Sequence, residues 1–286
     1  MSLREGAETI INQCLDVQED ENVVILNDAN KEELMDALLD VLVDMDVQHE
    51  LIEFEEPENH GEEPPKLVAK EMKKADVVIA PTMKSLSHTD ARKDANKAGT
   101  RVATLPTVSE EIWNSSLQAD YEKVAEITEK VYDLLAETDE VRITTPSGTD
   151  LSFDVEIETY HADTGMINES GDFGNLPAGE PNGYPANING TLVLDHFQFS
   201  PSAKKVEIKN GEVVALKNKE GENSSELEKA FEKHPCSKKI AEFGFGTNPE
   251  AELIGNTLQD EKVLGTIHIA FGDNCSYVKE GDDRRN

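Results

Sequence analysis

The hydrophobic positions in the first half of the chain follow two alternating periods. Short apolar runs, typical of buried strands, recur at residues 23–26, 49–54, 76–81 and 101–106. Segments with helical periodicity lie between them, at residues 31–45, 65–75 and 88–99. Buried strands that alternate with amphipathic helices predict a parallel α/β sheet. No GxGxxG motif follows the first strand, so this Rossmann-like pattern does not predict a dinucleotide site.

The pattern changes after a long helical stretch at about 108–137. Residues 141–156 predict two strands around a Pro-Ser-Gly turn, and residues 204–217 predict a hairpin that turns at Asn210-Gly211. We therefore expect the fold class α/β in two domains. Residues 1–138 form a parallel, Rossmann-like α/β domain, and residues 139–286 form a β-rich α+β domain.

The charge balance is strongly acidic. The chain has 27 Lys and Arg against 59 Asp and Glu, a net charge of −32. Such a surface repels nucleic acid and anionic membranes, so we expect neither as a partner. The acids could form a surface that binds cations, or a coat suited to high salt, where screening weakens self-repulsion. Because lysine is scarce and the acids recur at helix-surface spacing, the halophilic interpretation is favoured.

The cysteines and the apolar segments bear on localisation. Cys14, Cys236 and Cys275 are far apart and include no CxxC pair, so neither a disulfide framework nor a thiolate metal site is predicted. No window approaches the roughly 20 apolar residues of a membrane span. We expect a cytoplasmic protein.

His88 follows a predicted strand end, where α/β sheets often bind ligands. It could therefore contact a substrate. The alternative is favoured: residues 87–89 have the composition of a helix entry and N-cap.

Two later strands each contain one residue able to bind a metal. Strand alternation places Glu242 on the same face as Gly244 and Gly246, and His268 on a face with small neighbours. A carboxylate in such a strand is costly to bury without a cation, and carboxylate with imidazole can bind Zn²⁺, Co²⁺, Mn²⁺ or Fe²⁺. A structural Glu242 paired with a lysine, and a satisfied core or edge His268, remain as alternatives. Glu180 is the third candidate ligand. It lies earlier in the chain, in a loop rich in Gly and Pro, where spacing alone predicts a surface turn.

Four segments together resemble the thermophilic aminopeptidase family of metallopeptidases, which includes leucyl aminopeptidases, and in particular its short archaeal-type members. They are GNLPAGE (174–180), AEFGFGTNP (241–249), DEKVLGTIHIAFGDN (260–274) and the region 77–106. The resemblance implies two divalent metal ions (Zn, Co or Mn), with Glu180, Glu242 and His268 as ligands. It also implies hydrolysis of N-terminal peptide bonds by a metal-activated water. We expect a peptide as substrate and a homodimer as the assembly.

The sequence also departs from that family. No His-x-Asp pair follows His268, and Cys275 stands where the family has a tyrosine, so Tyr277 is the candidate for the catalytic hydroxyl. The resemblance therefore implies a chain that is incomplete at its C-terminus and an impaired site. Asp260, Glu261 and Asp273 are nearby acids that could replace the absent ligands.

Two other functions remain open. Iron-dependent ring-opening dioxygenases that act on dihydroxypyridines share a similar C-terminal motif set. A non-catalytic member that keeps the fold for binding or assembly is the third alternative, because the ligand set is incomplete.

Overall fold

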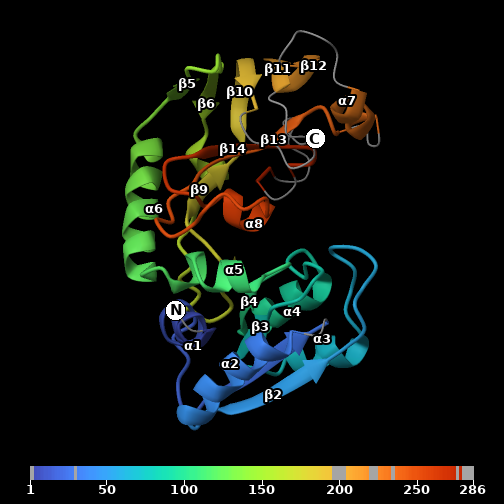
Figure 1. Cartoon of the computed structure of the whole chain (residues 1–286), viewed down its shortest axis with the longest axis vertical. Helices are drawn as coiled ribbons and strands as arrows, with labels where there is room; N and C mark the ends of the chain where they lie inside the picture. Colours follow the sequence, from blue (N-terminus) through green and yellow to red (C-terminus); the bar gives the residue numbers. More distant parts are fainter. Residues whose placement is uncertain are drawn as a thin grey trace.

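A five-stranded parallel sheet forms the first half of the molecule (Figure 1). The computed structural model describes residues 3–28, 31–194, 204–218, 225–232, 236–274 and 277–278. The strand order is β2-β1-β3-β4-β8, and every pairing is parallel. The strands are β1 (Asn22–Asn27), β2 (Gln48–Glu53), β3 (Val77–Ala80), β4 (Arg101–Thr104) and β8 (Phe173–Asn175).

Helices cover both faces of this sheet because its central strands are apolar on both sides. Every residue of β3 and β4 is buried. One face packs against the short helix α1, the π-helix η1 and the apolar stripe of α2, and the other packs against α3 and α4. These elements are α1 (Leu3–Glu8), η1 (Thr9–Cys14), α2 (Glu32–Asp44), α3 (Lys66–Met72) and α4 (Asp90–Ala98).

The helical stretch expected at 108–137 is interrupted, so that prediction is wrong in its length. It consists of α5 (Glu110–Trp113), the 3-10 turn η2 (Ser116–Gln118) and α6 (Tyr121–Ala136). Ser109 caps α5 and Asp120 caps α6, each accepting a backbone N–H three residues on. Each cap residue has extended backbone, which separates the helices. α6 then runs along one side of the molecule toward the second half (Figure 1).

Two antiparallel sheets form the second half. The first has the order β12-β11-β10-β6-β5, and the second has the order β14-β13-β9-β7. Phe153 of the first and Phe243 of the second lie 4.6 Å apart between ring centroids, in a shared apolar core. The elements are β5 (Glu140–Thr144), β6 (Asp150–Val155), η3 (Ile157–Thr159), β7 (His161–Asp163), β9 (Glu180–Gly183), β10 (Pro185–Val193), β11 (Lys204–Lys209), β12 (Glu212–Asn218), α7 (Ser225–Phe231), β13 (Ile240–Phe245), α8 (Thr257–Asp260) and β14 (Ile267–Phe271).

The fold class α/β is confirmed, and several local predictions hold. The hairpin turns at Asn210 and Gly211, which both have positive φ (49° and 75°), as the Asn-Gly pair predicts. The predicted boundary near residue 138 falls between α6 and β5. It stays a prediction, because β8 lies beyond it in sequence yet pairs with β4 of the parallel sheet.

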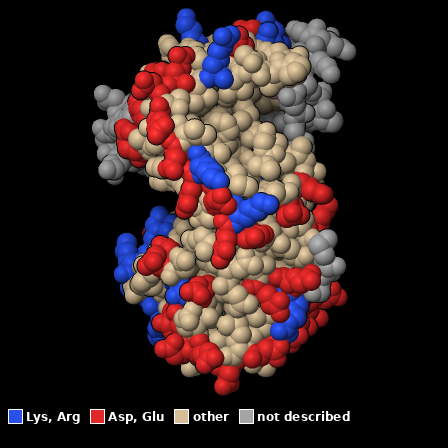
Figure 2. Space-filling model, turned by 90° about the vertical axis from the view of Figure 1, so that its left-hand side faces the viewer, with Lys and Arg blue, Asp and Glu red and all other residues tan. Residues whose placement is uncertain are grey.

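Acidic side chains are spread over both halves of the face shown in Figure 2, with fewer basic ones among them. No helix in the described part of the chain is both long and apolar enough to span a bilayer. Cys14 is a buried free thiol, and Cys275 lies outside the described residues. Salt dependence and the homodimer stay predictions.

Candidate metal centre

Three adjacent strands bring the predicted ligands together. Glu180 begins β9, Glu242 lies in β13 and His268 lies in β14, and β13 pairs with both of the other strands. Gly244 is the register partner of His268 on one side and of Asn182 on the other. One donor atom from each of the three residues lies within 4.8 Å of the others. They are the one group in the described chain with this geometry, although Glu180 and His268 are far apart in sequence.

Gly244 in β13 and Gly246, just after the strand, both clear space, but in two different ways. A Cβ atom on Gly244 would lie 2.3 Å from Cε1 of His268, so the imidazole ring occupies the place of the missing side chain. A Cβ on Gly246 would instead lie 2.0 Å from the backbone oxygen of Val263. Gly244 therefore makes room for a candidate ligand, whereas Gly246 admits the backbone of a neighbouring segment.

The surface turn that spacing alone predicts for Glu180 is wrong. Glu180 is only 3% exposed. The preceding Gly179 has φ +121°, and a Cβ there would lie 2.9 Å from Cβ of Asn248, so a larger residue would not fit. Backbone hydrogen bonds from Gly179 to Asp163 and from Thr247 to Gly179 fix the start of β9. Glu180 therefore points into the protein from a rigid backbone.

Lys262, which the sequence analysis missed, is the ionic partner of Glu180. Its Nζ lies 2.5 Å from Oε1 of Glu180, and Lys262 is 2% exposed. Asn182 Nδ2 donates a second hydrogen bond to the same oxygen, at 2.9 Å. The alternative of an acid paired with a lysine thus applies to Glu180, not to Glu242. A lone lysine inside the acidic segment DEKVLG (260–265) was the available signal.

The other atoms of the group face one another without hydrogen bonds. Within the described residues, Oε2 of Glu180 and Nε2 of His268 are buried and have no hydrogen-bond partner. They lie 3.2 Å apart, and Nε2 is 3.7 Å from Oε1 of Glu242. Buried polar atoms left in this state are unfavourable, unless a ligand binds there.

The charges in this group shift several pKa values. Burial raises the pKa of Asp163, the register partner of Glu180, to about 7, although Lys262 opposes this shift. Burial alone would lower the pKa of Lys262, but neighbouring carboxylates, Glu180 foremost, raise it above its ordinary value. The pKa of His268 is likewise lowered by burial, yet the two glutamates raise it overall.

Tyr277 lies beside Glu242. Burial raises the pKa of its phenol, and the charge of Glu242 and a hydrogen bond with that carboxylate raise it further. Its ring stacks on that of His161, with centroids 5.8 Å apart. Tyr277 therefore adjoins the ligand group, and its role as a catalytic hydroxyl stays a prediction.

The other acids and His88 lie outside the three-residue group. Asp260 accepts hydrogen bonds from the backbone of Ile254 and Gly255, which is a structural role. Oε2 of Glu261 lies 3.4 Å from Nζ of Lys262, and Asp273 is exposed. Thr89 caps α4 by accepting a hydrogen bond from the backbone of Arg92, as the helix-entry interpretation of residues 87–89 predicted.

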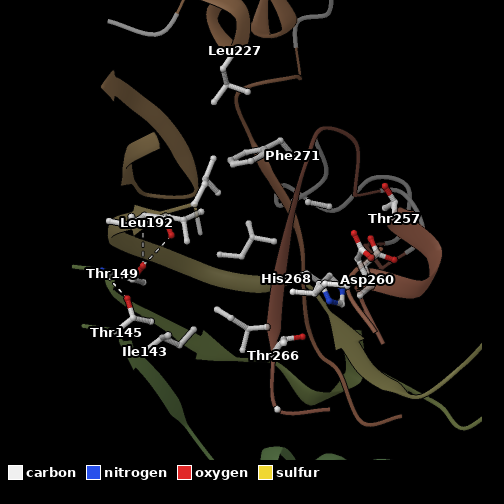
Figure 3. Close-up of a pocket in the computed structure, with 18 of the residues that line it drawn as sticks. Ile143, Thr145, Thr149, Leu192, Leu227, Thr257, Asp260, Thr266, His268 and Phe271 are labelled. Carbon is white, nitrogen blue, oxygen red and sulfur yellow. Dashed lines mark hydrogen bonds between the residues drawn. The ribbon is translucent and has the colours of Figure 1, made fainter. Parts of the chain in front are cut away.

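A cavity of about 790 Å³ adjoins His268. Most of its lining is apolar, from β5, β10, α7 and β14. In Figure 3, Leu192, Leu227 and Phe271 lie toward one side, and His268 and Asp260 lie toward the other. A cavity with an apolar wall and a few polar groups near a candidate metal site suits a small organic substrate.

The fold and this group of residues define a class: an α/β protein in which two carboxylates and an imidazole converge and could hold a metal ion. A sequence model of the family "2,5-dihydroxypyridine 5,6-dioxygenase" matches residues 5–275. The chain belongs to this family. No curated protein matches it significantly.

Two solved structures share the fold. The 2,5-dihydroxypyridine dioxygenase of Pseudomonas putida KT2440 has a TM-score of 0.77 at 17% identity, over 99% of this chain and 88% of that chain. AmpT of Thermus thermophilus has a TM-score of 0.65 at 16% identity, over 95% of this chain and 85% of that chain. At these identities the likeness concerns the fold alone.

These findings correct the sequence analysis. The assignment to the thermophilic aminopeptidase family is wrong, and so are the terms hydrolase, aminopeptidase and protease, because the family match is to an oxygenase. The family implies a metal cofactor, and the described residues include one group able to hold an ion.

Proposed function

We propose that this protein is an iron(II)-dependent dioxygenase that opens the ring of a dihydroxypyridine. The observation that carries the proposal is the convergence of Glu180, Glu242 and His268 in a chain of the dihydroxypyridine dioxygenase family. The alternative named from the sequence is thus favoured over the aminopeptidase.

The three residues fit a single ferrous ion. Oε2 of Glu180 and Nε2 of His268 are buried donors that lack a hydrogen bond from any described residue. Glu242 adds a second carboxylate oxygen on the same side of the sheet. Carboxylates with imidazole are ligands typical of non-haem Fe(II) oxygenases, whereas sites for softer metals use thiolates. Glu180, Glu242 and His268 would hold the ion.

Bound iron supplies the redox chemistry that lets dioxygen react with an aromatic ring, with both oxygen atoms entering the product. The protein's own residues place and shield the substrate. Ile267, Ile269 and Phe271 project from the face of β14 opposite to His268 and line the apolar part of the cavity, where they would shield a flat ring from water. The ring's hydroxyl groups would lie at the end of the cavity that His268 reaches from the other face of the strand. Tyr277 holds Glu242 through its hydrogen bond.

The test is oxygen uptake under defined metal conditions. Purified protein in molar KCl is loaded with Fe²⁺ without air and then mixed with 2,5-dihydroxypyridine and dioxygen. We expect one dioxygen consumed per ring opened, and no uptake with 2-hydroxypyridine, which lacks the second hydroxyl group. His268→Ala, which removes one of the three candidate metal ligands, serves as the negative control. Protein that binds Fe²⁺ but consumes no dioxygen with any dihydroxypyridine isomer contradicts the proposal.

A further inference from the structure

We infer that Lys262 is a positioning residue that occupies one oxygen of Glu180, so that Glu180 offers a single oxygen to the metal. This inference rests on the metal site of the proposed function. It adds a residue that determines how many ligand atoms Glu180 supplies.

The geometry divides the Glu180 carboxylate into two unlike oxygens. Oε1 accepts hydrogen bonds from Lys262 Nζ at 2.5 Å and from Asn182 Nδ2 at 2.9 Å. Oε2 accepts none within the described chain and faces His268 Nε2 at 3.2 Å. Two donors on one oxygen, one of them charged, also fix the rotation of the carboxylate.

The backbone holds the ammonium group in place. Lys262 donates its N–H to the Gln259 carbonyl and accepts from the N–H of Asn248, both at 2.9 Å. The carbonyl carbon of Lys262 lies so close to Gly246 that a Cβ there would be 2.8 Å away. Gln259 is itself buried and accepts a hydrogen bond from the Ser116 hydroxyl. Lys262 is therefore part of a rigid turn rather than a flexible surface side chain.

The ammonium group of Lys262 also balances the negative charge of the buried carboxylates around it. A buried carboxylate without a cation is strongly unfavourable, and Glu180 lies near Glu242 and Asp163. In the metal-free protein Lys262 is the permanently charged partner of Glu180 among the described residues, and His268 adds a second positive charge at 3.2 Å when it is protonated. Removing the ammonium should leave Oε1 with the Asn182 hydrogen bond alone, so that this oxygen can become a second metal ligand. It should also leave the metal-free protein with less positive charge beside its buried carboxylates.

The experiment compares wild type with Lys262→Met, using Co²⁺ as the probe and no substrate. Visible absorption of Co²⁺ weakens as its coordination number rises, and thermal melts with Co²⁺ or EDTA give the shift in Tm on metal binding. For Lys262→Met we expect a lower Tm in EDTA, a larger upward shift with Co²⁺, and a weaker Co²⁺ absorption. Lys262→Arg, which keeps a charged donor, should restore the wild-type absorption.

The matched control is Lys31→Met, since Lys31 is a partly buried lysine of the parallel-sheet half that donates to the Pro81 carbonyl. It should leave the absorption and the Co²⁺-induced shift unchanged. Equal absorption and equal shifts in wild type and Lys262→Met would overturn the inference. So would a Lys262→Met protein that stays unfolded even with Co²⁺, because the metal should replace the lost cation.

The outcomes separate this inference from the proposed function. Wild-type protein that binds no Co²⁺ overturns the metal site and the role of Lys262 with it. Wild-type protein that binds Co²⁺, shows the expected change in Lys262→Met and yet has no dioxygenase activity contradicts the activity alone.

Discussion

The parallel sheet and the sheet that carries Glu180, Glu242 and His268 solve opposite physical problems. In the first, β3 is buried along its whole length and presents apolar side chains to helices on both faces. In the second, Glu180 at the start of β9 is as buried as those residues but is ionisable. Hydrophobic burial stabilises the first sheet directly. In the second, burial of a charge is tolerated only because a partner compensates it.

The difference lies in what each side chain depends on. An apolar residue such as Ile79 packs against several neighbours, and no one of them is indispensable. Glu180 depends on one lysine and one amide on Oε1, while its other oxygen accepts no hydrogen bond from a described residue and lies 3.2 Å from His268 Nε2. The second sheet should therefore respond to single changes of charge, and the response should depend on metal.

The largest expected effect is that of Glu180→Gln. The change removes the closest counter-ion of the buried Lys262 and leaves it only the more distant Glu261, so we expect a loss of roughly 3–5 kcal/mol in the free energy of unfolding. Urea denaturation with and without EDTA measures it, and the loss should appear in both. Adding Lys262→Met to Glu180→Gln should recover part of the stability, because the remaining pair is neutral. Equal stability of wild type and Glu180→Gln would show that the pair is not coupled.

Glu242→Gln should behave differently although both residues are candidate ligands. The Glu242 side chain is 19% exposed, and no lysine or arginine of the described chain pairs with it. We expect little change of stability in EDTA, and a loss of about 100-fold or more in Co²⁺ affinity, since even indirect partners of a metal are worth 10–100-fold. Calorimetric titration with Co²⁺ measures the affinity. A stability loss that ignores the chelator would contradict Glu242 as a ligand.

Gly244→Ala tests the clearance around His268. The added Cβ would lie 2.3 Å from the imidazole, so the ring must move, at about 1–3 kcal/mol for an overpacked site. Gly183→Ala in the neighbouring strand is the control, because its Cβ would lie 2.4 Å from the Tyr160 ring instead. Both variants should lose stability, but only Gly244→Ala should also lose Co²⁺ affinity. Equal affinities would mean that His268 is not a ligand.

The parallel sheet was predictable from the sequence because its signals are local. Apolar runs gave β1, β3 and β4, and the Asn210-Gly211 pair gave the hairpin turn. β8 has only three residues and forms a strand because it pairs with β4 in the parallel sheet. The sequence around β8 therefore contains no local pattern that predicts a strand. Ser109 and Asp120, the N-cap residues within 108–137, are local signals of helix starts. The helical periodicity of the residues around them obscured these signals.

The site was only partly predictable. Alternation placed Glu242 and His268 on suitable faces, but the burial of Glu180 depends on Lys262, which is 82 positions away. Such a pairing cannot be inferred from the spacing of either segment. The family assignment failed because the motifs around Glu180, Glu242 and His268 are similar in aminopeptidases and in dihydroxypyridine dioxygenases. Those motifs predict a metal site and do not determine the reaction.

The smallest expected step is a pH dependence of Asp163, which pairs across the strands with Glu180. Burial raises its pKa from 3.8 to about 7, so between these pH values the folded protein keeps a proton that the unfolded chain has already released. The stabilisation is therefore full below about pH 4 and is lost as the pH rises toward 7. Asp163→Asn cannot ionise, so in EDTA its Tm should be closest to that of wild type near pH 4 and should exceed it increasingly as the pH rises. Within the single unit from pH 6 to pH 7, wild type should lose roughly 1 kcal/mol relative to Asp163→Asn, or about 2–4 °C in Tm. Thermal melts from pH 4 to 8 measure it. A lower Tm at pH 8 would mean that ionised Asp163 supports the Lys262 ammonium, and that the second sheet needs all of its buried acids even without metal.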